Sequence, residues 1–120
     1  MKLKVHYLFF VLVISSFITP SGDCVRKGHF TNSLDIETSG EVLLKTNKKG
    51  KAVVILQNDF KTQEGPDLDI YLSTTLQVND SSLKVSNLWE VKGYQKFVSS
   101  KPVEVSEVNY IVIHCTQYNH

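Results

Sequence analysis

The sequence predicts an all-β fold, a small antiparallel β-sandwich or barrel-like domain that follows a signal peptide. No stretch after Gly22 keeps the helical spacing of apolar residues over about ten or more positions. Short runs in which apolar and polar residues alternate recur instead at intervals of about ten residues, and Gly, Pro and Asn separate them. Short strands with turns between them are typical of an antiparallel sandwich or barrel.

Residues 1–22 are predicted to be a secretory signal peptide. Lys2 and Lys4 precede an apolar run over residues 7–18, and small, helix-breaking residues follow it. The run is shorter than the roughly 20 residues that a membrane-spanning helix needs, and an uncleaved anchor is the alternative. We therefore expect an exported protein that is secreted, periplasmic or held at the cell surface, with no transmembrane span in the mature chain.

The remaining residues, 23–120, are expected to form one domain. Asn47 to Gly50 is predicted to form a hairpin turn, because Asn and Gly tolerate positive φ angles. The Gly65-Pro66 pair is predicted to make a corner before the next strand. The predicted strands are Glu41–Thr46, Lys51–Gln57, Leu68–Thr74, Leu83–Leu88, Tyr94–Ser99 and Tyr110–Thr116.

Composition gives little sign of a charged partner. Without Lys2 and Lys4, 11 basic residues remain against 12 acidic ones, so the mature domain is close to neutral. Nucleic-acid binding needs a basic surface that neutralises phosphates, and no such surface is predicted. We expect a monomer whose partner is an unknown redox or surface protein.

The stretch "EGPDLDIYLS", residues 64–73, raises the question of a site. Its apolar residues alternate with Asp69 and Tyr71, which places the two polar side chains on the opposite face of a strand. We expect Asp67 to accept backbone N–H bonds at the corner, as Asp does in turns, and Asp69 to be solvated. The interpretation is structural rather than catalytic.

No motif for a nucleophile, a phosphate loop or a paired-cysteine metal site is present. The histidines at 29, 114 and 120 are not spaced to share one strand face, and a zinc site made from two of them with Asp67 is not favoured. We expect no metal site and no catalytic activity of the domain's own. Trp89 is expected to anchor the core or its rim.

The two cysteines are Cys24 and Cys115, at opposite ends of the mature chain. An even number of cysteines after a signal peptide favours a disulfide. Cys115 shares a strand face with Ile111 and Ile113, and a thiol buried there would be a poor nucleophile. The sequence leaves a disulfide and a reduced thiol open.

The order of several motifs resembles the electron-transfer DM-thirteen domain family. The motifs are "GHF" at 28–30, "TSG" at 38–40, "NDFKTQEGPDLDIYLS" at 58–73, "GYQKF" at 93–97 and "YIVIHC" at 110–115. Members continue past the cysteine with an aromatic-glycine segment, so the resemblance implies either a domain that is incomplete at its C-terminal end or one with a shortened edge there.

The resemblance implies a small extracellular β domain proposed to serve in electron transfer or oxidative modification at cell surfaces. It marks Cys115 as the redox candidate, either as a bare thiol or as the residue that holds a group such as haem. The family positions carried over as structural are Gly65, Pro66, Asp67, Leu68, Tyr71 and Leu72. The sequence therefore supports two alternative functions: a redox accessory module acting through Cys115, and a non-catalytic binding or adhesion module with a structural disulfide.

Overall fold

A computed structural model of the chain describes residues 7–18, 24–31, 37–65 and 67–115. The all-β prediction is confirmed, since the described residues form antiparallel strands and one short 3-10 helix, η1 (Val105–Glu107). The strands are β1 (Tyr7–Ile18), β2 (Cys24–Thr31), β3 (Thr38–Ser39), β4 (Glu41–Thr46), β5 (Lys51–Leu56), β6 (Lys61–Thr62), β7 (Leu68–Ser73), β8 (Leu83–Asn87), β9 (Gln95–Pro102) and β10 (Tyr110–Cys115). No helix among these residues is long and apolar enough to cross a membrane.

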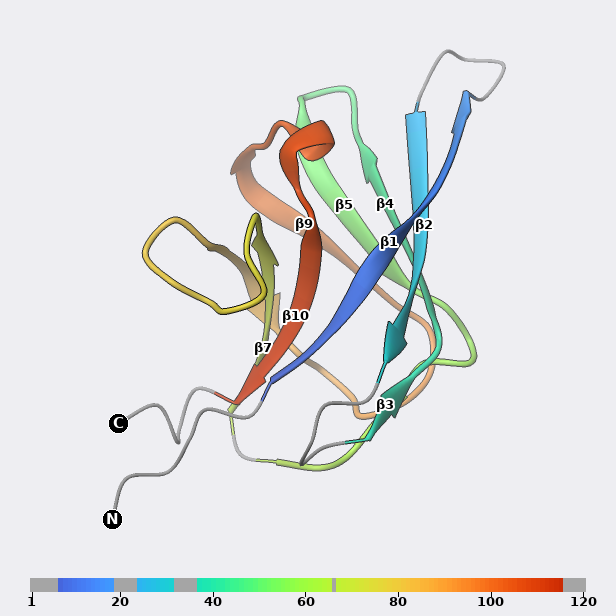
Figure 1. The fold of residues 1–120 in the computed structure, drawn as a ribbon, viewed down its shortest axis with the longest axis vertical. Coiled ribbons are helices and arrows are strands. Elements are labelled where there is room, and N and C mark those ends of the chain that lie inside the picture. Colours follow the sequence, from blue (N-terminus) through green and yellow to red (C-terminus); the bar gives the residue numbers. More distant parts are fainter. Residues whose placement is uncertain (1–6, 19–23, 32–36, 66, 116–120) are drawn as a thin grey trace.

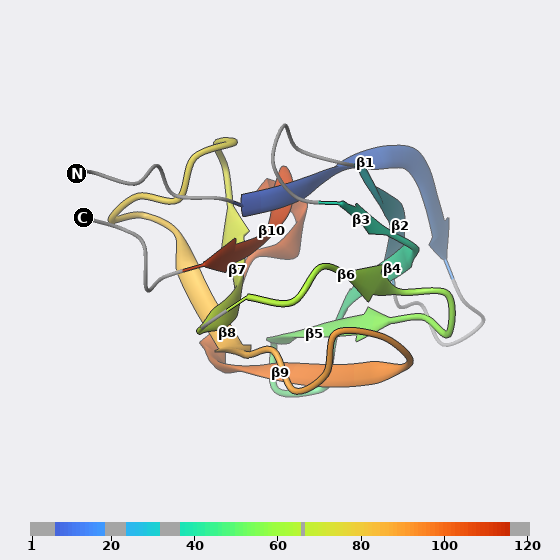
Figure 2. The same cartoon turned by 90° about the horizontal axis from the view of Figure 1, so that it is seen from below.

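Eight strands form one sheet in the order β8-β7-β10-β1-β2-β4-β5-β9. The two end strands, β8 and β9, come close to each other, so the sheet curls into a barrel-like shape (Figures 1 and 2). The two-stranded sheet of β3 and β6 lies at one end of this barrel, and η1 lies at the other. Arg26 of β2 holds η1 in place, because its guanidinium Nη1 donates to the carbonyls of Val105 at 2.6 Å and Val108 at 2.7 Å.

The core follows the alternation of the strands. On β10, Ile111, Ile113 and Cys115 point into the core cluster, as the sequence predicts for one face of that strand. The same holds on β7, where alternate apolar residues join the cluster. The apolar interior is completed by residues of β2, β4, β5 and β9 and by Phe60: Phe30, Val42, Leu44, Ala52, Val54, Leu56 and Phe97.

The predicted hairpin between β4 and β5 is present. The side-chain oxygen of Asn47 accepts the backbone N–H groups of Lys49 at 2.9 Å and Lys51 at 3.0 Å. The backbone N–H of Gly50 donates to the Asn47 carbonyl at 3.0 Å and closes the turn. Asn47 thus fixes the turn through the local side-chain bonding that favours Asn in this position.

The sequence does not predict β2, β3 and β6. Strand β2 has no regular alternation, since Arg26, Lys27 and Gly28 interrupt it, but it pairs with β1 on one side and β4 on the other. Strands β3 and β6 are each two residues long, too short to give a pattern. These strands are therefore determined by pairing with partners that are distant in sequence.

Strand β1 covers the apolar run of the predicted signal peptide. It pairs with β10 on one side and β2 on the other, from Tyr7 opposite His114 to Ile18 opposite Cys24. Removal of residues 1–22 stays a prediction. Its structural consequence is that the facing edges of β2 and β10 would lose their main-chain partner, and unpaired edges recruit other strands.

The chain crosses itself closely at Gly40. A Cβ atom built on Gly40 would lie 2.5 Å from the Cα of Phe60 and 2.7 Å from the carbonyl oxygen of Asp59. Gly40 also has a φ of +111°, in a region that residues with a side chain rarely adopt. The carbonyl of Gly40 accepts the N–H of Phe30 at 2.9 Å, so this crossing joins β2 to the segment before β6.

We expect Gly40→Ala to lower the free energy of unfolding by roughly 2–4 kcal/mol, because it adds a backbone clash to an unfavourable φ angle. Gly93→Ala is the matched control: Gly93 also has a positive φ of 95°, but a Cβ there would meet nothing within 4 Å. It should cost only about 1 kcal/mol, from the φ angle alone. Urea unfolding measures both, and equal losses would contradict the close approach as the cause.

Candidate binding site beside the Gly65 corner

The corner before β7 forms one wall of the candidate site. Asp67 has a positive φ of 51°, a conformation that Asp tolerates better than most residues. Its side chain is exposed, and Leu68, the next residue, points into the core cluster. Asp67 contributes to the expected turn through its backbone conformation, since no backbone N–H among the described residues donates to its side chain.

The residues after β8 form the opposite wall. The side-chain amide of the buried Gln95 holds this segment: its Oε1 accepts the N–H groups of Trp89 at 3.2 Å and Glu90 at 3.0 Å. Its Nε2 donates back to the Glu90 carbonyl at 2.9 Å. One buried amide thus satisfies three backbone groups of a loop that has no sheet partner of its own there.

Backbone bonds tie the two walls to each other and to the rest of the barrel. The N–H of Leu88 donates to the carbonyl of Leu68 at 2.8 Å, and the N–H of Thr62 donates to the carbonyl of Val91 at 2.7 Å. The N–H of Gly93 donates to the carbonyl of Phe60 at 2.9 Å. One bond thus joins the two walls directly, and two more fix the segment after β8 to Phe60 and Thr62.

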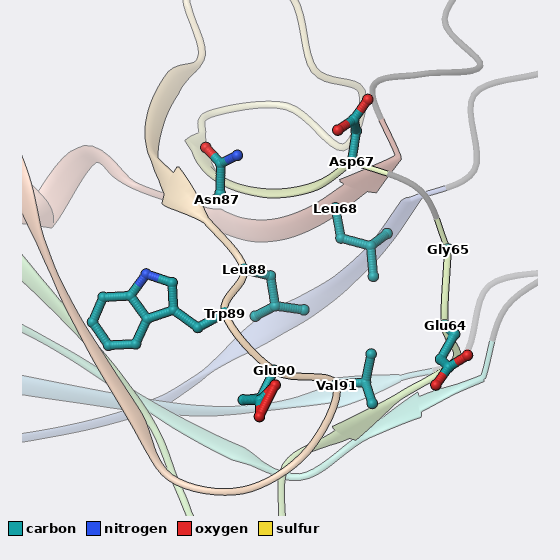
Figure 3. A pocket seen from close by; sticks show the side chains of 9 residues that line it. All are labelled: Glu64, Gly65, Asp67, Leu68, Asn87, Leu88, Trp89, Glu90 and Val91. Atoms are coloured by element: carbon teal, nitrogen blue, oxygen red, sulfur yellow. The ribbon is translucent and has the colours of Figure 1, made fainter.

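Between the two walls lies a cavity of about 620 Å³, open to solvent (Figure 3). This is within the range of about 300–1,000 Å³ that is usual for small-ligand sites. Figure 3 shows Leu68, Leu88 and Val91 pointing into the space between the walls. The lining residues are Glu64, Gly65, Asp67, Leu68, Asn87, Leu88, Trp89, Glu90 and Val91.

Of the two places predicted for Trp89, the core and its rim, the structure favours the rim. Trp89 is 63% exposed and lines the cavity, so it is not a core residue. Its ring leans on Phe97 of β9 with ring centroids 4.6 Å apart, which explains why so large a side chain keeps a defined place at the surface. The expectation of an anchor at the rim is met in part, since only the Phe97 side of the indole is covered.

Cys115, the predicted redox residue, lies at the end of β10 and is only 2% exposed. A Cβ built on Gly65 would be 3.8 Å from its Sγ and 3.4 Å from a methyl group of Leu68. Burial among apolar groups is unfavourable for the thiolate that redox chemistry requires. Haem ligation by Cys115 does not fit this arrangement. Leu68 lines the cavity and packs with Cys115 in the core cluster, whereas Cys115 itself is not among the lining residues.

The structure does not bring Cys24 and Cys115 together. Cys24 lies opposite Ile18, at the end of β1. Cys115 follows His114, which lies opposite Tyr7 at the start of β1 (Figure 1). The eleven steps of strand from Tyr7 to Ile18 span up to about 36 Å, at roughly 3.3 Å per residue. A disulfide requires Cα atoms about 4.4–6.8 Å apart, so the predicted Cys24–Cys115 bond does not fit this arrangement.

Asp69 is buried, contrary to the expectation that it is solvated. It is 3% exposed, and its Oδ1 lies 3.4 Å from Nζ of Lys84 on β8. His114, opposite Asp69 in the register of β7 and β10, is also 3% exposed, and its ring meets Tyr71 edge-on at 5.4 Å. Alternation along β7 places Asp69 on the outer face correctly, but the pattern of one strand cannot show that this face is covered.

Burial lowers the pKa of His114 below its ordinary value of 6.5, and the negative charge of Asp69 opposes that shift. The other histidine that the structure describes, His29, is exposed on β2, which β10 and β1 separate from β7 in the sheet. No group of three His, Cys, Asp or Glu side chains in the described ranges could hold a metal ion. His120 lies outside the described residues, as does Pro66.

Comparison with known proteins finds no match to a family model, to a curated protein or to a solved structure. The resemblance to the DM-thirteen domain family therefore stays a prediction from motifs. The residues of those motifs are placed as follows: Gly40 at the chain crossing, Gly65, Asp67 and Leu68 at the cavity, Gln95 beneath the Trp89 loop, and Cys115 in the core. Gln95 is the site residue that the sequence interpretation missed, and its only signal is a polar residue between Tyr94 and Phe97.

We expect Asp69→Ala to lower the free energy of unfolding by roughly 1–3 kcal/mol, because it removes a buried carboxylate and leaves its neighbours without a partner. Asp67→Ala should change it by no more than about 0.5 kcal/mol, since Asp67 is exposed. Urea unfolding of the two variants gives the comparison. A larger loss of unfolding free energy for Asp67→Ala than for Asp69→Ala would instead support Asp67 as the residue that accepts backbone N–H bonds at the corner.

Stability is expected to fall as the pH drops below about 6.5. In this window the unfolded chain protonates His114 while the folded chain, with its lowered pKa, does not, so protonation favours unfolding. Urea midpoints at pH 7.5 and 5.5 should differ more for the original chain than for His114→Gln. His29→Gln, an exposed control, should retain the full difference, and an unchanged difference in His114→Gln would contradict the role of His114.

Proposed function

We propose that this chain is a non-catalytic binding module, exported or at the cell surface, that holds a segment of a partner protein in the cavity between the Gly65 corner and the Trp89 loop. The observation that carries the proposal is the fixed construction of that cavity. A backbone bond from Leu88 to Leu68 joins its walls, and the buried amide of Gln95 holds the Trp89 loop, so the site needs little ordering before it binds.

The chemistry of the lining also favours binding over catalysis. Leu68, Leu88 and Val91 supply an apolar surface, and Asn87 supplies an amide that can both donate and accept hydrogen bonds. No histidine, cysteine, lysine or serine is among the lining residues, so the titratable groups of the acid-base kind there are the carboxylates of Glu64, Asp67 and Glu90. A partner side chain that fills the cavity would bury apolar surface on both molecules.

The experiment uses the full chain, labelled with ¹⁵N, and a set of blocked tripeptides, acetyl-Ala-X-Ala-amide, in which X is each of the common residues. At least one peptide should shift the backbone amides of residues 87–91 and the indole N–H of Trp89 in a saturable way. Trp89→Ala should weaken that binding several-fold, because it removes one margin of the cavity. Tyr94→Ala is the control, since Tyr94 is a similarly exposed aromatic residue outside the lining.

A set of peptides that leaves these amides unshifted would overturn the proposal, as would equal binding to Trp89→Ala and the original chain. A folded spectrum of each variant is required for either result. Tyr94→Ala then separates loss of the site from a general effect of truncating an exposed aromatic residue.

A redox accessory role through Cys115 is the second candidate. The observation in its favour is that the residue over the sulfur is Gly65, which has no side chain and is itself exposed, so the cover is thin. In thiol–disulfide exchange, the Cys115 thiolate would attack a disulfide of a partner protein and form a mixed disulfide, and one partner thiolate would leave.

Reaction of native Cys115 with a thiol-reactive disulfide reagent distinguishes the two candidates. We expect the native thiol to react far more slowly than the same thiol in urea, and Gly65→Val to slow it further. Native reaction as fast as in urea, together with loss of peptide binding in Cys115→Ser, would favour the redox role instead.

A further inference from the structure

The cavity beside the Gly65 corner carries a charge pattern that identifies the class of its ligand. Three carboxylates, Glu64, Asp67 and Glu90, are among its lining residues, and no lysine, arginine or histidine is. The two lysines nearest to the walls in sequence, Lys61 and Lys92, pair with each other across a β-bridge and do not line the cavity. The lining therefore presents more polar than apolar surface, with carboxylates around a smaller apolar part made by Leu68, Leu88 and Val91.

These carboxylates are not committed to partners within the described part of the chain. The ion pairs found there join Lys27 to Glu41 and Lys84 to Asp69, and neither involves a cavity residue. None of the hydrogen bonds there ends on a carboxylate oxygen of Glu64, Asp67 or Glu90. Their negative charge is thus available to a ligand.

The acids are also set apart from one another. Glu64 and Asp67 come from the corner, whereas Glu90 comes from the loop on the opposite wall (Figure 3). The carboxylate of Asp67 points away from Leu88 and Val91. They do not form a group that could hold a metal ion, among the residues that the structure describes. Between them lie the side chains of Leu68, Leu88 and Val91. A compact inorganic cation would leave this apolar surface uncovered.

We propose that the cavity binds the basic side chain, lysine or arginine, of an extended segment of a partner protein. Such a side chain has an aliphatic stem that packs on apolar surface and a cationic head that stays at the polar margin. The stem matches Leu68, Leu88 and Val91, and the head matches the carboxylates of Glu64, Asp67 and Glu90. This inference rests on the proposed binding function and adds the chemical class of the ligand.

The test compares peptides that differ in charge alone. Acetyl-Ala-Lys-Ala-amide is the cationic probe, the norleucine peptide keeps the stem without the charge, and the 2-aminoadipate peptide carries a negative charge. Trp89 is the single tryptophan of the chain and lies in the lining, so its fluorescence reports on the site directly. We expect the lysine and arginine peptides to bind at least about tenfold more tightly than the norleucine peptide, and the 2-aminoadipate peptide not to bind.

Charge-removing variants identify the acids that act. Glu64→Gln and Glu90→Gln should each weaken the lysine peptide by about twofold to fivefold, the effect of one exposed ion pair, and leave the norleucine peptide unchanged. Glu107→Gln is the matched control, because Glu107 is an exposed acid in η1 at the other end of the barrel. Added salt should weaken the lysine peptide only.

The possible results distinguish the proposal of a basic ligand from the proposal of a binding module on which it rests. Equal binding of the lysine and norleucine peptides, or wild-type affinity in Glu64→Gln and Glu90→Gln, would overturn the cationic ligand and leave the binding module intact. Absence of any peptide-dependent change at Trp89 and at the amides of residues 87–91 would overturn both.

Discussion

The close crossing of the chain at Gly40 and Phe60 is the constraint on which the β3–β6 end of the barrel depends. Gly40 lets two backbones approach more closely than any side chain would allow. That contact places the buried ring of Phe60 edge-on against Phe30, at 5.5 Å, and brings β6 beside β3, where the buried hydroxyls of Thr38 and Thr62 hydrogen-bond to each other. From Phe60 and Thr62, backbone bonds then reach Gly93 and Val91 and position the loop that forms one wall of the cavity.

The candidate site therefore forms because the closed barrel brings distant segments together, and no single sequence motif makes it. Its walls come from the segment before β7 and the segment between β8 and β9, and both lack regular strand pairing over most of their length. Backbone groups outside a sheet must still find partners, and here Gln95, Phe60 and Leu68 provide them. The same bonds that satisfy the loop make the cavity a preformed one, which favours recognition of a partner at low entropic cost.

Two features of the fold bear on the export and redox predictions. Strand β1 contributes a full strand to the barrel between β2 and β10, although its sequence has the character of a signal peptide. The structure describes this segment through its main-chain pairing with β2 and β10, which is the kind of contact that an added strand makes with a sheet edge. Cys115 pairs with Leu68 in the sheet register, and its side chain packs in the core cluster. Packing is therefore its main structural role, and any redox role would come in addition to it.

The fold class, six of the strands to within about three residues at each end, and the hairpin turn at Asn47 are predictable from the amino-acid order, because alternation and turn chemistry are local properties. So is the placement of Ile111, Ile113 and Cys115 on one buried face. The burial of Asp69 and His114, the place of Trp89 in the cavity lining and the support that Gln95 gives to the wall follow from the three-dimensional packing. Each of these depends on which distant segment covers a given face, and the period of a single strand carries no information about its neighbours.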